Sequence, residues 1–174
     1  MSRRDLLRRL VSICSAGLAL PLAIPGLAYL ISPLKKGSGE SSYDALARLS
    51  DLKVGEPRAF AVIRDLRDAW VKYPREPIGG VWLIRQPEGV DPPVVALTAE
   101  CPHLGCAVAL AADGKSFLCP CHNSVFGIDG KPQNAVSPRP MDPLDIQIAK
   151  GDDPEIRVKF ERFRPQSDRR IPLA

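Results

Sequence analysis

Both histidines and four of the five cysteines of this 174-residue chain lie between residues 101 and 122. Two short segments carry them: Cys-Pro-His-Leu-Gly-Cys at 101–106 and Cys-Pro-Cys-His-Asn-Ser at 119–124. Thiolates and imidazoles bind metal ions of intermediate softness, so two segments of this composition indicate one metal site. Any fold of this chain must therefore bring together two loops that are separated by twelve residues of sequence.

Four side chains have the spacing of metal ligands, Cys-x-His in the first loop and Cys-x₂-His in the second. They are Cys101, His103, Cys119 and His122. Two cysteines and two histidines can hold a tetrahedral zinc ion, which is one alternative. A zinc site has no use for the remaining Cys106 and Cys121, one in each loop, whereas a cross-link between the loops is a natural use. If each iron of a two-iron cluster takes a matched pair, the two cysteines bind one iron and the two histidines the other, as in a Rieske [2Fe–2S] centre.

The two loops resemble the signature of the Rieske iron–sulfur proteins of cytochrome bc-type complexes, which usually reads Cys-Thr-His-Leu-Gly-Cys and Cys-Pro-Cys-His-Gly-Ser. The resemblance implies that the four residues above hold one [2Fe–2S] cluster per chain. It implies a disulfide between Cys106 and Cys121, and a hydrogen bond from Ser124 to a cluster sulfur. It also implies that one of His103 and His122 hydrogen-bonds quinol and accepts its proton.

Phe126 stands where the high-potential members of that family have a tyrosine. A hydroxyl group that hydrogen-bonds a cluster sulfur stabilises the reduced, more negative cluster, so its loss lowers the reduction potential. We therefore expect a lower potential than in ubiquinol-oxidising members, which suits menaquinol, a stronger reductant. Simple packing of Phe126 beneath the cluster is the alternative, and the two interpretations are compatible.

Three further features of the loops are compared with the family pattern. Asn123 replaces a glycine, and if its φ is positive, asparagine is the next best residue. The nearest match to the family's proline-rich covering loop is residues 135–140, in which Pro138 is retained. Leu104 lies between ligand positions and is expected to shield the cluster, with an ordinary place in the core as the alternative.

The N-terminal part reads as a membrane anchor. Residues 10–34 contain no charged side chain, and a helix of that length spans about 37 Å, against about 30 Å of bilayer hydrocarbon. Four arginines precede the stretch and two lysines follow it, which places the N-terminus in the cytoplasm and the rest on the periplasmic or outer face of the cytoplasmic membrane. Residues 2–7 resemble a twin-arginine export signal, the alternative being that the arginines are only anchors. We predict an uncleaved anchor at 1–34, although residues 26–28 resemble a signal-peptidase site.

The net charge of +4 is concentrated at the N-terminal end. Residues 1–36 hold six basic residues and one acidic residue, whereas residues 37–174 hold 18 basic and 19 acidic residues and are nearly neutral. No basic stripe is present, so the sequence excludes nucleic acid as a partner. Residues 35–44 are rich in glycine and serine and predict a flexible hinge linker.

The region 45–174 is predicted to be an all-β, antiparallel Rieske-type sandwich or barrel head, with a small cluster-binding subdomain at about 98–141. Short apolar or alternating stretches predict strands; they are 59–63, 81–84, 94–97, 144–148 and 156–161. Residues 150–154 read as a hairpin turn. Fifteen prolines in residues 37–174 disfavour long helices, and only residues 64–73 could hold a helical turn.

The resemblance implies the iron–sulfur subunit of a membrane quinol–cytochrome c oxidoreductase of a respiratory chain, which is not catalytic alone. Its partners would be a cytochrome b-type subunit, quinol, a cytochrome c-type acceptor and membrane lipid, with the head moving on the linker. One alternative is the small subunit of a molybdenum-type arsenite oxidase, whose second loop often reads His-x-Ser-Val-Phe, as residues 122–126 do. Another is a soluble Rieske ferredoxin, which would normally lack both the anchor and the second cysteine pair.

Overall fold

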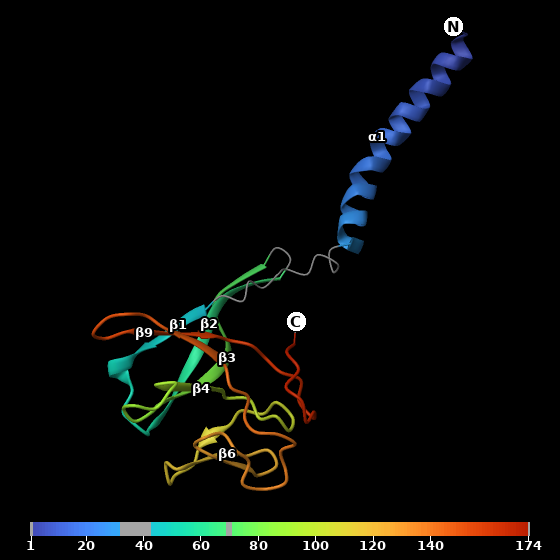
Figure 1. Ribbon diagram of the computed structural model, residues 1–174. Helices are drawn as coiled ribbons and strands as arrows, with labels where there is room; N and C mark the ends of the chain where they lie inside the picture. Colours follow the sequence, from blue (N-terminus) through green and yellow to red (C-terminus); the bar gives the residue numbers. More distant parts are fainter. Residues whose placement is uncertain (1, 32–42, 69–70, 174) are drawn as a thin grey trace. The chain divides into compact units, whose positions relative to one another are not determined.

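The N-terminal helix is the first of two units into which the chain divides. The structure is a computed structural model that describes residues 2–31, 43–68 and 71–173 (Figure 1). Helix α1 spans Arg3–Ile31 and includes two prolines. Its N-terminus is capped by Ser2, whose hydroxyl accepts a hydrogen bond from the backbone N–H of Asp5. By length and composition, α1 is the one helix among the described residues that could cross a membrane.

The second unit, the head, is built from three antiparallel sheets of three strands each. The first sheet has the order β1 (Tyr43–Arg48), β9 (Glu155–Lys159), β8 (Asp145–Ile148). The second has the order β2 (Pro57–Asp68), β3 (Val71–Arg85), β4 (Val94–Thr98). The third has the order β5 (Ala109–Leu110), β6 (Ser116–Cys119), β7 (Ser124–Gly127), and a 3₁₀ turn, η2 (Leu49–Asp51), follows β1. This arrangement confirms the predicted all-β head.

The second sheet is buried on both faces where β3 pairs with β4. Val81 and Leu83 point into a core shared with β8 and β9, while Trp82 and Ile84 point into a second core shared with β6 and β7. A strand buried on both sides needs apolar residues at consecutive positions, which explains the unbroken apolar runs at 81–84 and 94–97. The strands predicted at 144–148 and 156–161 alternate instead, because only one of their faces is buried.

The second core attaches the small third sheet to the rest of the head. Phe117 and Phe126 are fully buried and directly opposite each other on β6 and β7. The Trp82 ring lies 5.0 Å from the Phe117 ring, measured between centroids, and its indole N–H donates to the Val108 carbonyl at 3.1 Å. Aromatic packing and this hydrogen bond therefore fix the strands that carry the second cysteine–histidine loop.

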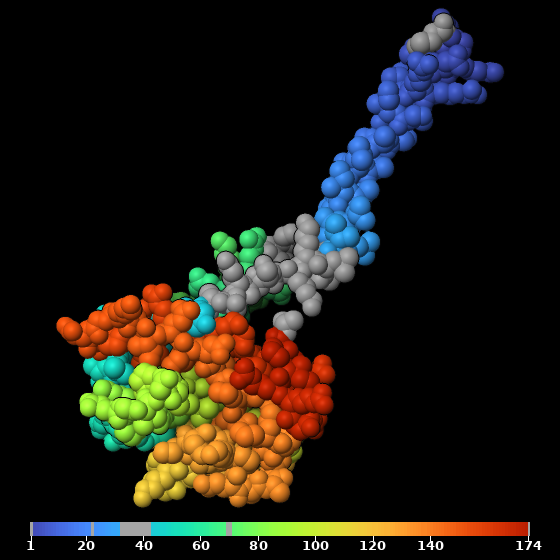
Figure 2. Space-filling view, viewed as in Figure 1, coloured from blue at the N-terminus to red at the C-terminus, as the bar shows by residue number. Residues whose placement is uncertain are grey.

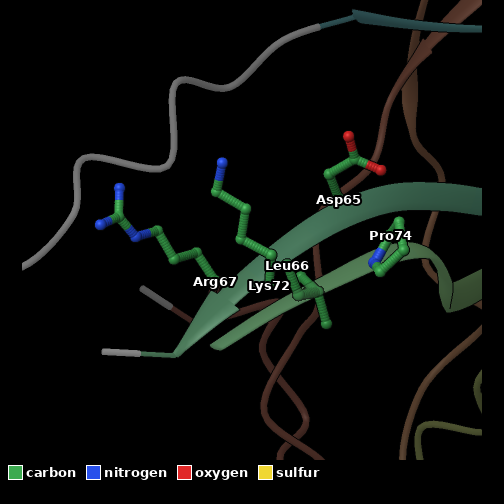
Figure 3. Close-up of a pocket in the computed structure, with 5 residues that line it drawn as sticks. All are labelled: Asp65, Leu66, Arg67, Lys72 and Pro74. Carbon is green, nitrogen blue, oxygen red and sulfur yellow. The ribbon is translucent and has the colours of Figure 1, made fainter. Parts of the chain in front are cut away.

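The helical turn considered for residues 64–73 is wrong. β2 continues to Asp68 and β3 begins at Val71, with Leu66 opposite Tyr73, so the segment belongs to a β-hairpin. We call the residues 64–68 and 71–77 the arm. Its side chains are mostly exposed, so neither face shows the alternation that signals a half-buried strand. A groove on the arm is lined by Asp65, Leu66, Arg67, Lys72 and Pro74 and shares no residue with the cysteine–histidine loops (Figure 3).

The predicted hinge linker lies mainly outside the described residues. Of its span, 35–44, only Tyr43 and Asp44 are described, and both belong to β1. The carboxylate of Asp44 forms a partly buried ion pair with Arg64, with 2.6 Å between the closest oxygen and nitrogen. The last two residues assigned to the linker are therefore part of the head.

We predict that Leu83→Ala destabilises the head strongly. Leu83 is fully buried in the core between the first two sheets, and truncating a buried leucine costs about 2–5 kcal/mol. The control is Leu66→Ala on the arm of the same hairpin, where the side chain is 43 % exposed and the expected loss is below about 0.5 kcal/mol. Denaturant unfolding of the detergent-solubilised chain measures both, and equal losses would contradict the assignment of the core.

Candidate metal centre

The first loop is a tight turn that follows β4 and closes on itself. The backbone N–H of Cys101 donates to the Cys106 carbonyl at 2.8 Å, and the N–H of Gly105 donates to the Cys101 carbonyl at 2.8 Å. Gly105 has φ of +77°, a left-handed conformation that glycine adopts without a steric penalty. These bonds fix the backbone of residues 101–106, and with it the direction of the side chains at 101 and 103.

The second loop is the turn between β6 and β7. Cys119 is the last residue of β6 and lies opposite Ser124, the first of β7. Between them, Asn123 has φ of +56°, so the condition under which asparagine is the next best residue after glycine is met at this position. The side-chain amide of Asn134 donates to the Asn123 carbonyl at 2.7 Å. The turn is therefore held from the segment that follows β7, directly beside His122.

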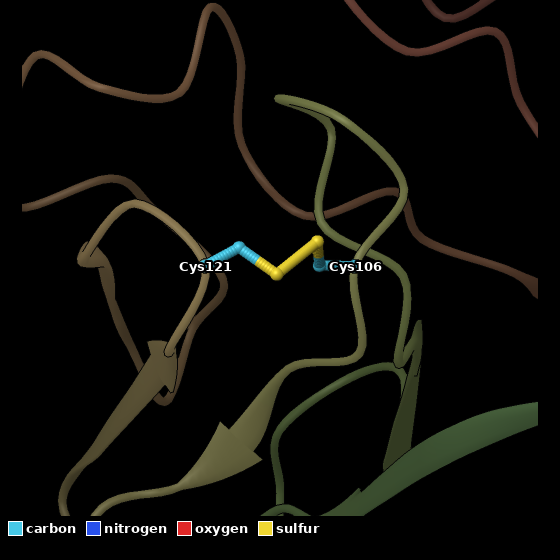
Figure 4. Close-up of a disulfide and its surroundings, with 2 residues drawn as sticks. All are labelled: Cys106 and Cys121. Carbon is cyan, nitrogen blue, oxygen red and sulfur yellow. A yellow bond between two sulfur atoms is a disulfide. The ribbon is translucent and has the colours of Figure 1, made fainter.

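A disulfide between Cys106 and Cys121 joins the two loops, as predicted (Figure 4). It connects the end of the first loop to the tip of the second, across a sequence separation of 15 residues. The sulfur atom of Cys119 and the two disulfide sulfurs all lie within 4.8 Å of one another. Because the disulfide sulfurs are not thiolates, Cys119 is the member of this trio that can bind a metal.

The structure pairs the four predicted ligands by type, cysteine with cysteine and histidine with histidine. Cys101 and Cys119 are each about 1 % exposed and are free thiols, close enough to hydrogen-bond each other. His103 is half-buried and His122 is exposed. Their rings are 4.8 Å apart between centroids and nearly perpendicular, with an interplanar angle of 82°. The cysteines thus form the inner part of the site and the histidines its outer edge.

Two buried side-chain atoms, Nδ1 of His103 and Oγ of Ser124, have no hydrogen-bond partner among the described residues. Buried polar atoms are nearly always paired, so an unpaired one needs an explanation. A ring nitrogen without a partner is free to bind a metal, and a hydroxyl without an acceptor is free to donate to an inorganic sulfide. The residues present therefore fit an iron–sulfur cluster at this place.

Burial raises the pKa of the Cys119 thiol above its usual range. The N–H groups of Cys121 and His122 donate to its sulfur and oppose this shift, whereas the neighbouring Cys101 thiol adds to it. Two thiolates side by side in a buried place repel each other and lack hydration. A bound iron ion supplies the positive charge that stabilises both thiolates, so these two cysteines are suited to metal binding.

The remaining predicted residues lie around this centre. Phe126 lies two residues after Ser124 on β7 and is buried in the second core, so it does pack there. Its effect on the reduction potential stays a prediction. Leu104 is 43 % exposed and is not a core residue. In the loop 135–140, Pro138 is exposed. The covering roles expected of Leu104 and Pro138 also stay predictions.

Sequence reasoning missed a buried ion pair in the segment 135–142. The guanidinium of Arg139 donates to both carboxylate oxygens of Asp142, at 2.9 and 2.7 Å, and both side chains are about 5–6 % exposed. The Arg-x-x-Asp spacing is a weak signal, since most charged pairs so spaced are on the surface.

The family model of the Rieske [2Fe-2S] domain matches residues 44–148, more than half of the chain. This chain belongs to the Rieske [2Fe-2S] family. A Rieske domain binds a [2Fe–2S] cluster, so the zinc alternative for the site is set aside. The matched range contains both loops and the disulfide, and it begins at the second residue of β1.

The similarity of this Rieske protein to curated relatives extends beyond the matched domain. It is 28 % identical to the menaquinol:cytochrome c reductase iron-sulfur subunit of Bacillus subtilis, over 83 % of each chain. It is 30 % identical to the cytochrome b6-f complex iron-sulfur subunit 2 of Synechocystis, over 75 % of this chain and 70 % of that one. Among solved structures, it is similar to a chain of a hyperthermophilic respiratory complex III, with a TM-score of 0.46, 20 % identity, and coverage of 83 % of this chain and 98 % of that one.

We predict that Cys101→Ser abolishes loading of the Rieske cluster. The substitution removes one of the two buried thiols that lie side by side, and a serine hydroxyl is a poor ligand for iron. The control is Cys14→Ser, which changes a free, exposed cysteine of α1 and should leave loading unchanged. Iron content and the visible spectrum of each purified variant report the outcome; a fully loaded Cys101→Ser variant would remove Cys101 from the ligand set.

Proposed function

We propose that this protein is the iron–sulfur subunit of a membrane quinol–cytochrome c oxidoreductase of the complex III type, and that its substrate is menaquinol. The observation that carries the proposal is the similarity to menaquinol:cytochrome c reductase iron-sulfur subunits, one from Bacillus subtilis over 83 % of each chain and one from Geobacillus thermodenitrificans over 87 % of this chain and 88 % of the other. Such coverage includes regions outside the cluster motif.

Cys101 and Cys119 would hold one iron and His103 and His122 the other. When bound, the cluster supplies a one-electron carrier whose potential is raised by the two neutral imidazole ligands. Ser124, whose hydroxyl lacks a partner in the protein, would donate to a cluster sulfur. The buried cysteines keep that side of the site away from water, and Leu104 and Pro138 would cover it further.

The histidine pair is the part of the site that a partner can reach. His103 is half-buried and His122 is exposed, and a ring bound through one nitrogen keeps the other nitrogen for a hydrogen bond. One of the two rings would accept a hydrogen bond from the quinol hydroxyl at its outer nitrogen and hold the proton there. Electron and proton would then leave quinol at one place.

The anchor and the linker determine where the head works. Helix α1 would span the cytoplasmic membrane once with its arginine-rich end in the cytoplasm, and the disulfide fits a head in an oxidising compartment outside. We assign residues 1–34 to the anchor, 35–44 largely to a hinge linker and 45–174 to the head, with β1 starting at Tyr43. The head would move between a cytochrome b-type subunit and a cytochrome c-type acceptor, both kept at high effective concentration by the tether.

The experiment that tests this function is an EPR-monitored redox titration of native membranes, with and without an inhibitor of the quinol site. We expect a Rieske signal whose potential lies in the lower part of the roughly −150 to +300 mV range, with a line shape that the inhibitor changes. A signal that ignores the inhibitor and leaves the membrane with a soluble molybdenum protein would replace the proposal with the arsenite-oxidase-type relay.

We predict that Phe126→Tyr raises the reduction potential and Ser124→Ala lowers it. Phe126→Tyr adds a hydroxyl group two residues after Ser124 on β7, and Ser124→Ala removes the Ser124 hydroxyl. A hydrogen bond donated to the cluster stabilises its reduced form. A newly buried hydroxyl that finds no acceptor would cost about 1–3 kcal/mol of stability, so thermal unfolding is measured beside the potential. An unchanged potential in a folded, loaded Phe126→Tyr variant would leave Phe126 as a packing residue only.

A further inference from the structure

The chain that follows β9 returns to the first cluster loop. Residues 162–167, which we call the C-terminal clamp, contact the loop on both sides of Cys101. The guanidinium of Arg162 donates to the carboxylate of Glu100 at 2.7 Å, immediately before Cys101. The backbone N–H of Gln166 donates to the carbonyls of Pro102 and His103, at 3.0 and 3.2 Å. Figure 2 shows this last part of the chain, in red, packed against the orange segment that carries Arg139.

The contact at Gln166 is made by backbone alone. Gln166 has φ of +56°, a left-handed conformation that is unfavourable for a residue with a Cβ, and its side chain is exposed. The left-handed turn aims its N–H at the two carbonyls of the first loop. A left-handed conformation at a residue other than glycine is kept only where surrounding contacts favour it, and this bond is one such contact.

Arg139 connects the clamp to the segment that is expected to cover the cluster. Beyond its two bonds to Asp142, its Nη1 donates to the Ser167 carbonyl at 2.6 Å. The Ser137 hydroxyl donates to the Arg139 carbonyl at 2.8 Å, and Ser137 is buried as well. A planar guanidinium can bridge a carboxylate and a carbonyl at fixed angles, which a lysine cannot do.

The clamp is itself braced. The backbone N–H of Arg164 donates to the Ile171 carbonyl at 2.9 Å, so the last residues fold back on the clamp. The Arg170 guanidinium lies over the Phe163 ring, 5.0 Å from its centroid, and donates to the Pro143 carbonyl at 3.1 Å. Phe163 is buried in the first core. The clamp is therefore tied to the main body of the head and can hold the loop against it.

We propose that the C-terminal clamp is a positioning element for the cluster site, with Arg139 as its link to the covering loop. The disulfide restrains the end of the first loop at Cys106, and the clamp restrains its beginning at residues 100–103. The clamp thereby sets the backbone position of His103 and the fit of its ring to the iron. This inference rests on the proposed role of His103 as a ligand.

The test replaces Gln166 in the full-length protein. Gln166→Pro removes the N–H donor and cannot adopt positive φ, so the clamp separates from the loop, while Gln166→Gly keeps the donor and suits the turn. We expect Gln166→Pro to shift and broaden the EPR signal, to change the reduction potential, and to lose the cluster several-fold faster in the presence of a chelator. We expect Gln166→Gly to match the wild type. Wild-type spectrum, potential and cluster lifetime in a folded Gln166→Pro variant would overturn the proposal.

A second variant decides the matter if Gln166→Pro fails to fold. Arg139→Lys retains a positive charge beside Asp142 but cannot also bridge to the Ser167 carbonyl, so the same spectral shift and faster cluster loss are expected in a milder form. If Gln166→Pro does not fold, a folded Arg139→Lys variant with wild-type spectrum and cluster lifetime would overturn the clamp proposal.

The failure of the clamp is distinguishable from the failure of the proposed function. A His103→Ala protein that retains the Rieske signal would remove His103 from the ligand set and the clamp proposal with it. If the clamp variants show the altered EPR signal but the signal of the wild-type protein does not respond to quinol-site inhibitors, the clamp proposal is supported and the quinol reaction is refuted. If the clamp variants have the wild-type EPR signal and the signal of the wild-type protein responds to the inhibitor, the clamp proposal is refuted and the quinol reaction is supported.

Discussion

The burial of both faces of the paired β3 and β4 strands supports the rest of the head. One face, through Val81 and Leu83, packs on the sheet of β1, β8 and β9. The other, through Trp82 and Ile84, packs on the small sheet that ends in the second cluster loop. The first cluster loop begins three residues after β4 ends. The first loop is therefore a short extension of the doubly buried sheet, the second loop belongs to the small sheet packed against it, and the relative position of the two loops follows from that packing.

The site divides its ligands by exposure, and this division serves its chemistry. Buried thiols are poor acids and need the charge of a metal to ionise, so burial makes the cysteines dependent on the cluster and keeps them from other reactions. Imidazoles at the rim keep one nitrogen available for a hydrogen bond to a partner. In the proposed function, the inner cysteines would retain the cofactor and the outer histidines would connect it to quinol.

Much of this architecture could be predicted from residue types. The cysteine and histidine spacing predicted the two loops, and the resemblance to the family signature implied the disulfide, whereas Asn123 was recognised only as suited to a positive φ if the position required one. The arm was mistaken for a helical turn because it is exposed on both sides, and a strand without a buried face has no alternation to reveal it. Arg139 was missed because its burial depends on tertiary packing. The contact at Gln166 uses a backbone N–H, which leaves no trace in the residue type.

The order in which the chain is made gives the C-terminal clamp a further consequence. A protein leaves the ribosome from its N-terminus, so the arginine-rich segment at residues 2–9 and both cluster loops emerge before the clamp near residue 166. Both cluster loops are complete before the residues that brace the first of them have been synthesised. If the clamp acts as proposed, the cluster site reaches its final rigidity only after residue 166 has been synthesised, and stable insertion of the cofactor would follow that step. An export route that accepts folded proteins would suit this order of events.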